Sequence, residues 1–220
     1  MMEGVINLLP ELWQAVKETG IMLGIGLTLS GLLGAALGTT LFLWRDERLL
    51  NRPTLYAIVG GLINVVRSFP FVILMIASAP LARTLAGTTI GPIAASVPLA
   101  IAGTAYFARL VELSLSDVPG GVIEAALAFG ASTTDIVFKV LLREARSGLV
   151  LGFTSLSVSY LSYSAAAGII GGGGVGDLAI RYGYYRFQTD VMFVTVLGLV
   201  LFVQAVQTLG NFISRRIDMR

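Results

Sequence analysis

Five long apolar stretches constrain the fold of this chain more than any other feature. Each holds about 20 or more mostly apolar residues, the length that a helix needs to cross the hydrocarbon core of a bilayer. They cover residues 19–44, 54–79, 90–110, 148–170 and 191–213. Only 13% of the 220 residues are charged and 55% are hydrophobic. The sequence therefore predicts an all-α, polytopic membrane protein with five transmembrane helices and a single transmembrane domain over residues 1–220.

Two residue types are missing, and their absence narrows the chemistry. The chain has no Cys, which excludes disulfides, thiolate metal sites and cysteine nucleophiles, and no His, the commonest general base. The predicted spans also hold no paired acidic residues. We therefore expect no catalytic residues, no metal site and no enzymatic activity. A net charge of +2 is too small to indicate a nucleic-acid partner.

The distribution of Lys and Arg predicts the topology. With five spans, ten of these residues fall on the side that holds the first loop, the loop 111–147 and the C-terminus, and four fall on the other side. The positive-inside rule then places the N-terminus outside and the C-terminus in the cytoplasm. Apolar residues ahead of the first span, among them Val5, Ile6 and Trp13, predict a short interfacial helix.

The cytoplasmic loop 111–147 is too rich in structural signals to be a linker. Pro119 and the following glycines break the chain, and residues 122–128 are then predicted to form a short helix that stops at Gly130. Ser132 or Thr133 can cap a further helix. This helix would carry Ile136, Val137, Val140 and Leu141 on one face. The loop either packs on the chain's own helix ends or forms a docking surface for a soluble partner.

Two further segments are candidates for a pathway or gate. Consecutive glycines at Gly171, Gly172, Gly173 and Gly174 indicate either a flexible turn or an extracytoplasmic gate or partner contact. Gly171, Gly173 and Gly176 match a dinucleotide-binding pattern, but the match follows a membrane span rather than a strand, and we reject that interpretation.

Inside the second span, Arg67 and Pro70 indicate a broken helix that lines a pathway. Alternatively, the span begins near Arg67 and residues 54–66 form an interfacial helix. Polar residues of the fourth span either line a pathway or hydrogen-bond between helices. They are Tyr160, Ser162, Tyr163 and Ser164. None of these residues identifies a substrate-binding site, which stays unknown at this stage.

The stretch from Glu124 to Gly130 resembles the E-A-A-x-x-x-G loop of permease subunits of bacterial, binding-protein-dependent ABC importers of type I. Arg143 stands where that family has a proline. Residues 64–71, 118–126 and 167–184 are similar to the methionine-import branch of the family, and the likeness extends from the first span to the C-terminus.

The resemblance implies a transport subunit in the bacterial cytoplasmic (inner) membrane that forms the pathway for D/L-methionine or close analogues. It implies a second copy of the chain, two cytoplasmic ATP-binding subunits and an extracytoplasmic substrate-binding (lipo)protein. No cofactor is expected on this chain, which has no G-x-x-x-x-G-K-[ST] loop, and ATP is expected on the partner. The residues expected to couple to the ATPase are Glu124, Ala125, Ala126, Gly130, Ala131 and Ser132. The alternatives are an ABC permease for another amino acid or a small peptide, and a secondary transporter.

Overall fold

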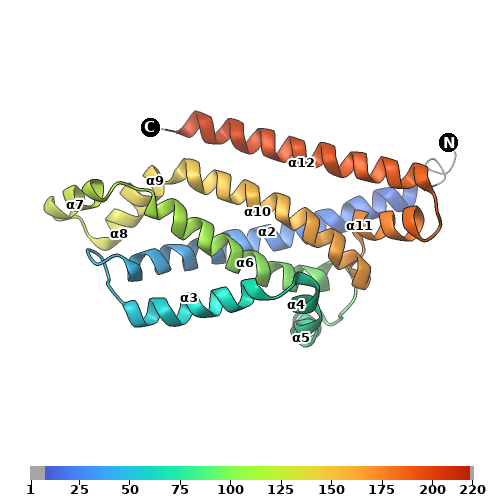
Figure 1. The fold of residues 1–220 in the computed structure, drawn as a ribbon, viewed down its shortest axis with the longest axis horizontal. Helices are drawn as coiled ribbons and strands as arrows, with labels where there is room; N and C mark the ends of the chain where they lie inside the picture. The colour runs from blue at the N-terminus through green and yellow to red at the C-terminus, as the bar shows by residue number, and fades with distance from the viewer. Residues whose placement is uncertain (1–7, 219–220) are drawn as a thin grey trace.

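The computed structural model describes residues 8–218, which form helices and contain no β-strand. Figure 1 shows the long helices running along one axis, with α7 and α8 at one end and α11 at the other. The long helices are α2 (Leu9–Arg45), α3 (Pro53–Ser68), α6 (Pro92–Ser116), α10 (Arg146–Ala167) and α12 (Thr189–Ile217). The short ones are α4 (Phe71–Ala77), α5 (Ala79–Ala86), α7 (Gly120–Ala128), α8 (Thr133–Asp135), α9 (Leu142–Glu144) and α11 (Gly174–Leu178). Three π-helical segments complete the chain, namely η1 (Ile136–Leu141), η2 (Gly168–Gly172) and η3 (Ala179–Tyr184).

Four of the five predicted spans correspond to long helices in the structure. Among residues 8–218, four helices are long and apolar enough to cross a membrane: α2, α6, α10 continued through η2, and α12. The fifth candidate is the pair α3 and α4, which is bent by 106°. Three of the long helices begin with a proline in the first turn, where the missing N–H is not needed and the fixed φ suits the helix.

The second predicted span is broken at Pro70, as the first of the two interpretations expects. Pro70 has no N–H to donate, so α3 ends at Ser68 and α4 starts in a new direction at Phe71. Arg67 lies exposed in the last turn of α3, a favourable position for a positive charge. Residues 54–79 therefore do not form one straight helix. The helix α3 continues through Arg67, and whether α3 lies in the membrane interface stays a prediction.

The helix α2 is longer than predicted. We expected a separate interfacial helix before the first span, but one helix of 37 residues runs from Leu9 to Arg45. Nothing after Pro10 interrupts the backbone hydrogen bonds, so the two segments join. Trp13 is exposed near the start of this helix, with the Lys17 ammonium 5.3 Å from its ring centroid. Val5 and Ile6 lie outside the described residues.

Tyr160 sits at the centre of the bundle, where α2, α6 and α10 meet. Its hydroxyl donates to the carbonyl oxygen of Leu99 at 2.5 Å and lies 2.5 Å from the hydroxyl of Ser30. A Cβ at Gly26 or Gly103 would overlap the Tyr160 ring, so the close packing of the three helices requires glycine there. Tyr160 therefore hydrogen-bonds between helices and is fully buried.

The other polar residues of the fourth span have different surroundings. Tyr163 stacks on Phe71 of α4, with ring centroids 4.6 Å apart. The Ser164 hydroxyl donates to the carbonyl oxygen of Leu161 in its own helix. Ser162 is exposed. The structure thus supports the interhelical alternative at Tyr160 and leaves Ser162 on the surface of the chain.

Candidate functional site: the coupling end of the bundle

The segment between α6 and α10 folds into a compact helical cap at one end of the bundle (Figure 1). Ile123 of α7 and Ile136 and Leu141 of η1 are fully buried and belong to the main hydrophobic core. The C-terminal end of α2 lies at this same end of the molecule. The loop therefore packs on the chain's own helix ends through one face, and the opposite face is left exposed. Packing on the chain's own helix ends therefore leaves one face of the loop available as a docking surface.

The helix α7 stops at Gly130, as predicted. Gly130 has φ +77°, a left-handed conformation that side chains other than glycine rarely adopt. Its N–H donates to the carbonyl oxygen of Leu127 at 2.9 Å, and the Ala131 N–H donates to that of Ala126 at 3.1 Å. This pair of bonds is the Schellman arrangement that satisfies the last carbonyl groups of a helix. Gly130 thereby fixes the direction in which the chain leaves α7.

Ser132, rather than Thr133, caps the next helix. The Asp135 N–H donates to Ser132 Oγ at 3.2 Å, and the Ser132 hydroxyl donates to Asp135 Oδ2 at 2.5 Å. Lys139 Nζ lies 2.5 Å from Asp135 Oδ1. The hydrogen bond from Lys139, and then that from Ser132, lowers the pKa of Asp135 to about 2. Asp135 is therefore a carboxylate at neutral pH, and it holds the start of this helix.

The helix that follows differs from the single α-helix we predicted. It makes one α-helical turn, then the π-helical turn η1, then the short helix α9. Ile136, Val137 and Leu141 are buried as expected, whereas Val140 is only half-buried. Arg143 lies exposed within α9, and the helix continues through it to Glu144.

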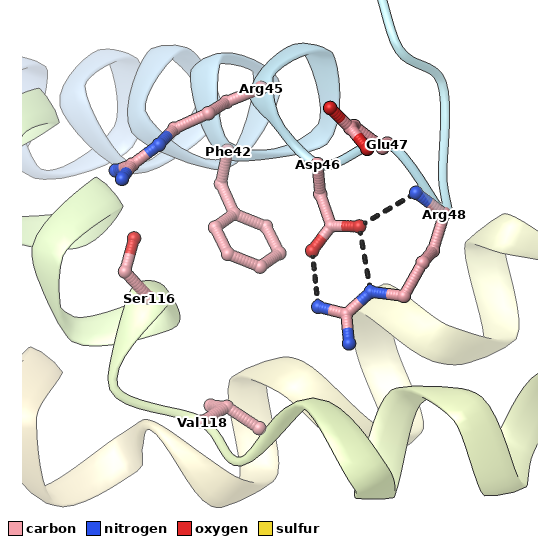
Figure 2. Close-up of a pocket in the computed structure, with 7 residues that line it drawn as sticks. All are labelled: Phe42, Arg45, Asp46, Glu47, Arg48, Ser116 and Val118. Carbon is pink, nitrogen blue, oxygen red and sulfur yellow. Dashed lines mark hydrogen bonds and ion pairs between the residues drawn. The ribbon is translucent and has the colours of Figure 1, made fainter.

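Glu124 is paired within its own chain, which the sequence analysis missed. Arg48 Nη1 donates to Glu124 Oε1 at 3.2 Å, across 76 positions in the sequence. The same guanidinium donates to Asp46 through Nη2 at 2.7 Å and Nε at 3.0 Å, as Figure 2 shows. Hydrogen bonding from Arg48 lowers the pKa of Asp46 and, in return, raises the pKa of Arg48. The resemblance implies for Glu124 only a role in coupling to the ATPase.

A cavity of about 380 Å³ opens beside Asp46 and Arg48, between the ends of α2 and α6. Phe42 and Val118 give it an apolar side, and Arg45, Asp46, Glu47, Arg48 and Ser116 give it a polar one (Figure 2). Within residues 8–218, no cluster of three or more acidic side chains that could hold a metal ion occurs.

A second ionic cluster lies deeper, around Glu112. Its side chain is buried, with the residue only 4% exposed, and Arg109 Nη1 donates to its Oε2 at 2.6 Å. The Tyr56 hydroxyl of α3 donates to Glu112 Oε1 at 3.0 Å, and Arg109 Nη2 donates to the carbonyl oxygen of Gly60 at 2.8 Å. We had placed Glu112 in the loop because the apolar stretch ends near residue 110, whereas α6 continues to Ser116. The i,i+3 spacing of Arg109 and Glu112 could have predicted their ion pair if the helix had been extended past residue 110.

The exposed face of the cap is apolar. Phe129, at the end of α7, is 92% exposed, and Phe138 of η1, Leu127 and Val122 are also exposed. Ala125 is exposed and small, so another surface can approach the helix closely. The sequence analysis quoted Phe129 within the motif but did not select it as a site residue. A fully exposed phenylalanine at a charged end of the molecule is typical of a contact with another protein.

The glycine run lies at the opposite end of the bundle from α7, where α11 begins (Figure 1). Gly171, Gly173 and Gly174 all have positive φ. The Gly174 N–H donates to Glu18 Oε2 of α2 at 2.8 Å, and the Gly91 N–H donates to the carbonyl oxygen of Gly171 at 2.9 Å. These bonds tie the run to α2 and to the segment that precedes α6. The predicted site residues thus fall into separate groups, with Arg67 and Pro70 at the junction of α3 and α4.

Comparison with known proteins gives consistent matches along the chain. Residues 32–220 match the family described as binding-protein-dependent transport system inner membrane component. The chain is 42% identical to a probable D-methionine transport system permease protein MetI of Vibrio cholerae, over 97% of this chain and 93% of that protein. It is 39% identical to the methionine import system permease protein MetP of Bacillus subtilis, over 96% of each. A solved inward-facing structure of the MetNI methionine ABC transporter contains a chain that superposes with a TM-score of 0.93 at 36% identity, covering 96% of this chain and 98% of that one.

Proposed function

Since the chain belongs to the family of binding-protein-dependent transport system inner membrane components, we propose that it is the membrane-spanning permease of an ATP-driven methionine importer. The observation that carries the proposal is the superposition on a chain of the MetNI methionine ABC transporter over nearly the whole length. The chain is a multi-pass inner membrane protein and a transport subunit, not an enzyme. ATP binds and is hydrolysed on a separate partner subunit.

In the proposed assembly, two copies of the chain meet two cytoplasmic ATP-binding subunits. The contact uses the exposed face of α7 and the turn after it, which support a role in coupling for Glu124, Ala125, Ala126, Gly130, Ala131 and Ser132. Phe129 extends this surface with a large apolar side chain. The N-terminus lies outside and the C-terminus lies in the cytoplasm. One permease domain over residues 1–220 then contains both the pathway and the coupling loop.

At the other end, a substrate-binding protein delivers methionine to the extracytoplasmic surface. The glycine run at Gly171, Gly172, Gly173 and Gly174 contributes to the outer gate. It has no side chains to block a close approach of backbone, and three of its four residues have positive φ. Arg67 and Pro70 contribute to the pathway at the bend between α3 and α4. The two ends alternate in their access to the pathway as the nucleotide state of the ATPase changes.

The experiment that tests this proposal measures uptake of labelled L- and D-methionine in cells that lack their own methionine importer. The cells receive the chain together with an ATPase and a binding protein of a methionine importer, or the same set without the chain. We expect uptake that requires ATP and survives collapse of the proton gradient. Uptake that follows the gradient would contradict the ATP-driven mechanism. ATP-dependent uptake of another amino acid, without methionine uptake, would contradict the substrate.

A further inference from the structure

In the loop between α2 and α3, the ion-paired residues Asp46 and Arg48 form an arm that reaches α7, the proposed coupling helix. Asp46 directly follows α2, and its N–H donates to the carbonyl oxygen of Phe42 at 3.0 Å, so it is fixed to the helix end. Its side chain is only 10% exposed and accepts from Arg48 Nε, Nη2 and the backbone N–H, the last at 2.9 Å. The Arg48 guanidinium is therefore held in one orientation relative to α2, because a planar fork bound at two donors cannot rotate freely.

The free side of this guanidinium lies against α7. Arg48 Nη1 bonds Glu124 at 3.2 Å, and a Cβ built on Gly120 would overlap the same Nη1 atom. Gly120 and Glu124 are four residues apart and so share one face of the helix. The contact thus combines an ion pair at one turn with a steric fit at the preceding turn. The neighbouring Gly121 has no atom within 4 Å of a built Cβ.

Beneath the arm, the hairpin of α2 and α3 is joined to α6 through Glu112. Tyr56 of α3 and Arg109 of α6 both donate to its carboxylate, and Arg45 Nη1 of α2 lies 3.9 Å from it. The neighbouring ends of α2, α3 and α6 are therefore already bonded to one another, and a displacement of Arg48 acts on all three.

We propose that Arg48 ties the coupling helix to the α2–α3 hairpin, so that movement of α7 displaces α2 and α3 as well as the helices to which α7 is joined in sequence. The inference rests on the proposed function, since it assumes that nucleotide binding on a partner moves α7. Arg48 acts here as a positioning residue, and it makes its contacts within the chain.

The test uses variants of the complete complex with its ATPase. Arg48→Ala and Glu124→Gln each remove one side of the ion pair, and the double variant removes both. Gly120→Ala keeps both charges but places a methyl group where the guanidinium lies. Two matched controls are Arg52→Ala, an exposed arginine of the same loop, and Gly121→Ala, the same change one residue further on.

The first readout is a distance between the two copies, measured by electron spin resonance in nucleotide-free and ATP-trapped complexes. The chain has no native cysteine, so a single label at Leu50→Cys reports the hairpin and one at Thr134→Cys reports the coupling loop. We expect both distances to change with nucleotide in the parent protein and in the controls. With Arg48→Ala or Gly120→Ala, the change at residue 134 remains and that at residue 50 becomes smaller, because the Glu112 bonds still connect the hairpin to α6. An unaltered change at residue 50 would overturn the proposal.

The second readout is methionine transported per ATP hydrolysed in proteoliposomes. A partly exposed ion pair of this kind biases an equilibrium by roughly threefold, so each single variant is expected to lower the ratio by about that factor. The double variant should lower the ratio no further, because Arg48→Ala, Glu124→Gln and the double variant all lose the same ion pair. Losses that multiply would show that Arg48 and Glu124 act independently and would overturn the proposal. Complexes are compared at equal assembly and thermal stability.

Failure of methionine transport in the parent protein would refute the proposed substrate, and the distance measurement would still decide on Arg48.

Discussion

Truncating Phe129 tests whether the exposed face of the cap docks the ATPase. Phe129 is 92% exposed in the isolated chain, so Phe129→Ala removes almost no contact within the fold. We therefore expect the thermal stability of the permease itself to stay unchanged. If the ring becomes buried on docking, its full apolar surface is withdrawn from water in the complex, which makes the substitution selective for assembly.

The magnitude follows from that exposure. Burying a phenylalanine side chain stabilises an interface by about 1.5–3 kcal/mol, and a central aromatic residue often contributes 2 kcal/mol or more. A loss of about 2 kcal/mol lowers the affinity of one loop for one ATPase subunit roughly 30-fold. Transport falls accordingly at limiting ATPase concentration and recovers when the ATPase is in excess.

The assay titrates purified ATPase against the detergent-solubilised permease and measures the dissociation constant. The matched control is Phe193→Ala, because Phe193 is 69% exposed but lies near the start of α12, far from the cap. Binding by Phe129→Ala that stays within about twofold of the parent protein would refute the docking role of this face. An equal loss with Phe193→Ala would show that the assay reports general damage instead.

Three further substitutions test other parts of the structure. Gly130→Val places a β-branched residue at φ +77°, at a cost of roughly 1–3 kcal/mol, and should reduce transport while membrane insertion, measured by immunoblot, persists. Tyr160→Phe leaves the Leu99 carbonyl without its buried donor, and should lower the free energy of unfolding by about 1–2 kcal/mol, which a thermal melt would detect; an unchanged melt would contradict the assigned bond. Ser132→Cys should react with an impermeant maleimide only from the cytoplasmic side, and reaction from outside would invert the topology.

The apolar stretches predicted the long helices well because crossing a bilayer imposes a minimum length of apolar sequence. Their ends were less predictable. The first helix extends back to Leu9 and the third forward to Ser116, since polar residues continue a helix once it leaves the hydrocarbon region. Pro70 gave a clear local signal for the break after Ser68. The 106° bend that follows depends on packing against α6 and α10, which no local pattern encodes.

The candidate site was predicted in part. The turn at Gly130 and the cap at Ser132 were recoverable because glycine and serine act on their immediate backbone neighbours. The pairing of Glu124 with Arg48 was not, because two exposed residues 76 positions apart carry no periodicity that relates them. The motif alone identifies Glu124 as a coupling residue and carries no information about Arg48. Only the folded chain places the end of α2 beside α7.

The unbroken course of α2 has a mechanical consequence. Glu18, which holds the glycine run, and Arg45, which precedes the Asp46–Arg48 arm, lie on one helix about 40 Å apart at 1.5 Å per residue. No proline or left-handed residue interrupts the helix between them, so its backbone stays helical over the whole distance. A tilt at the Arg45 end is therefore transmitted along one continuous helix to the glycine run at the other end. The two ends of the bundle are connected through a single element, without a relay of side chains across the bundle.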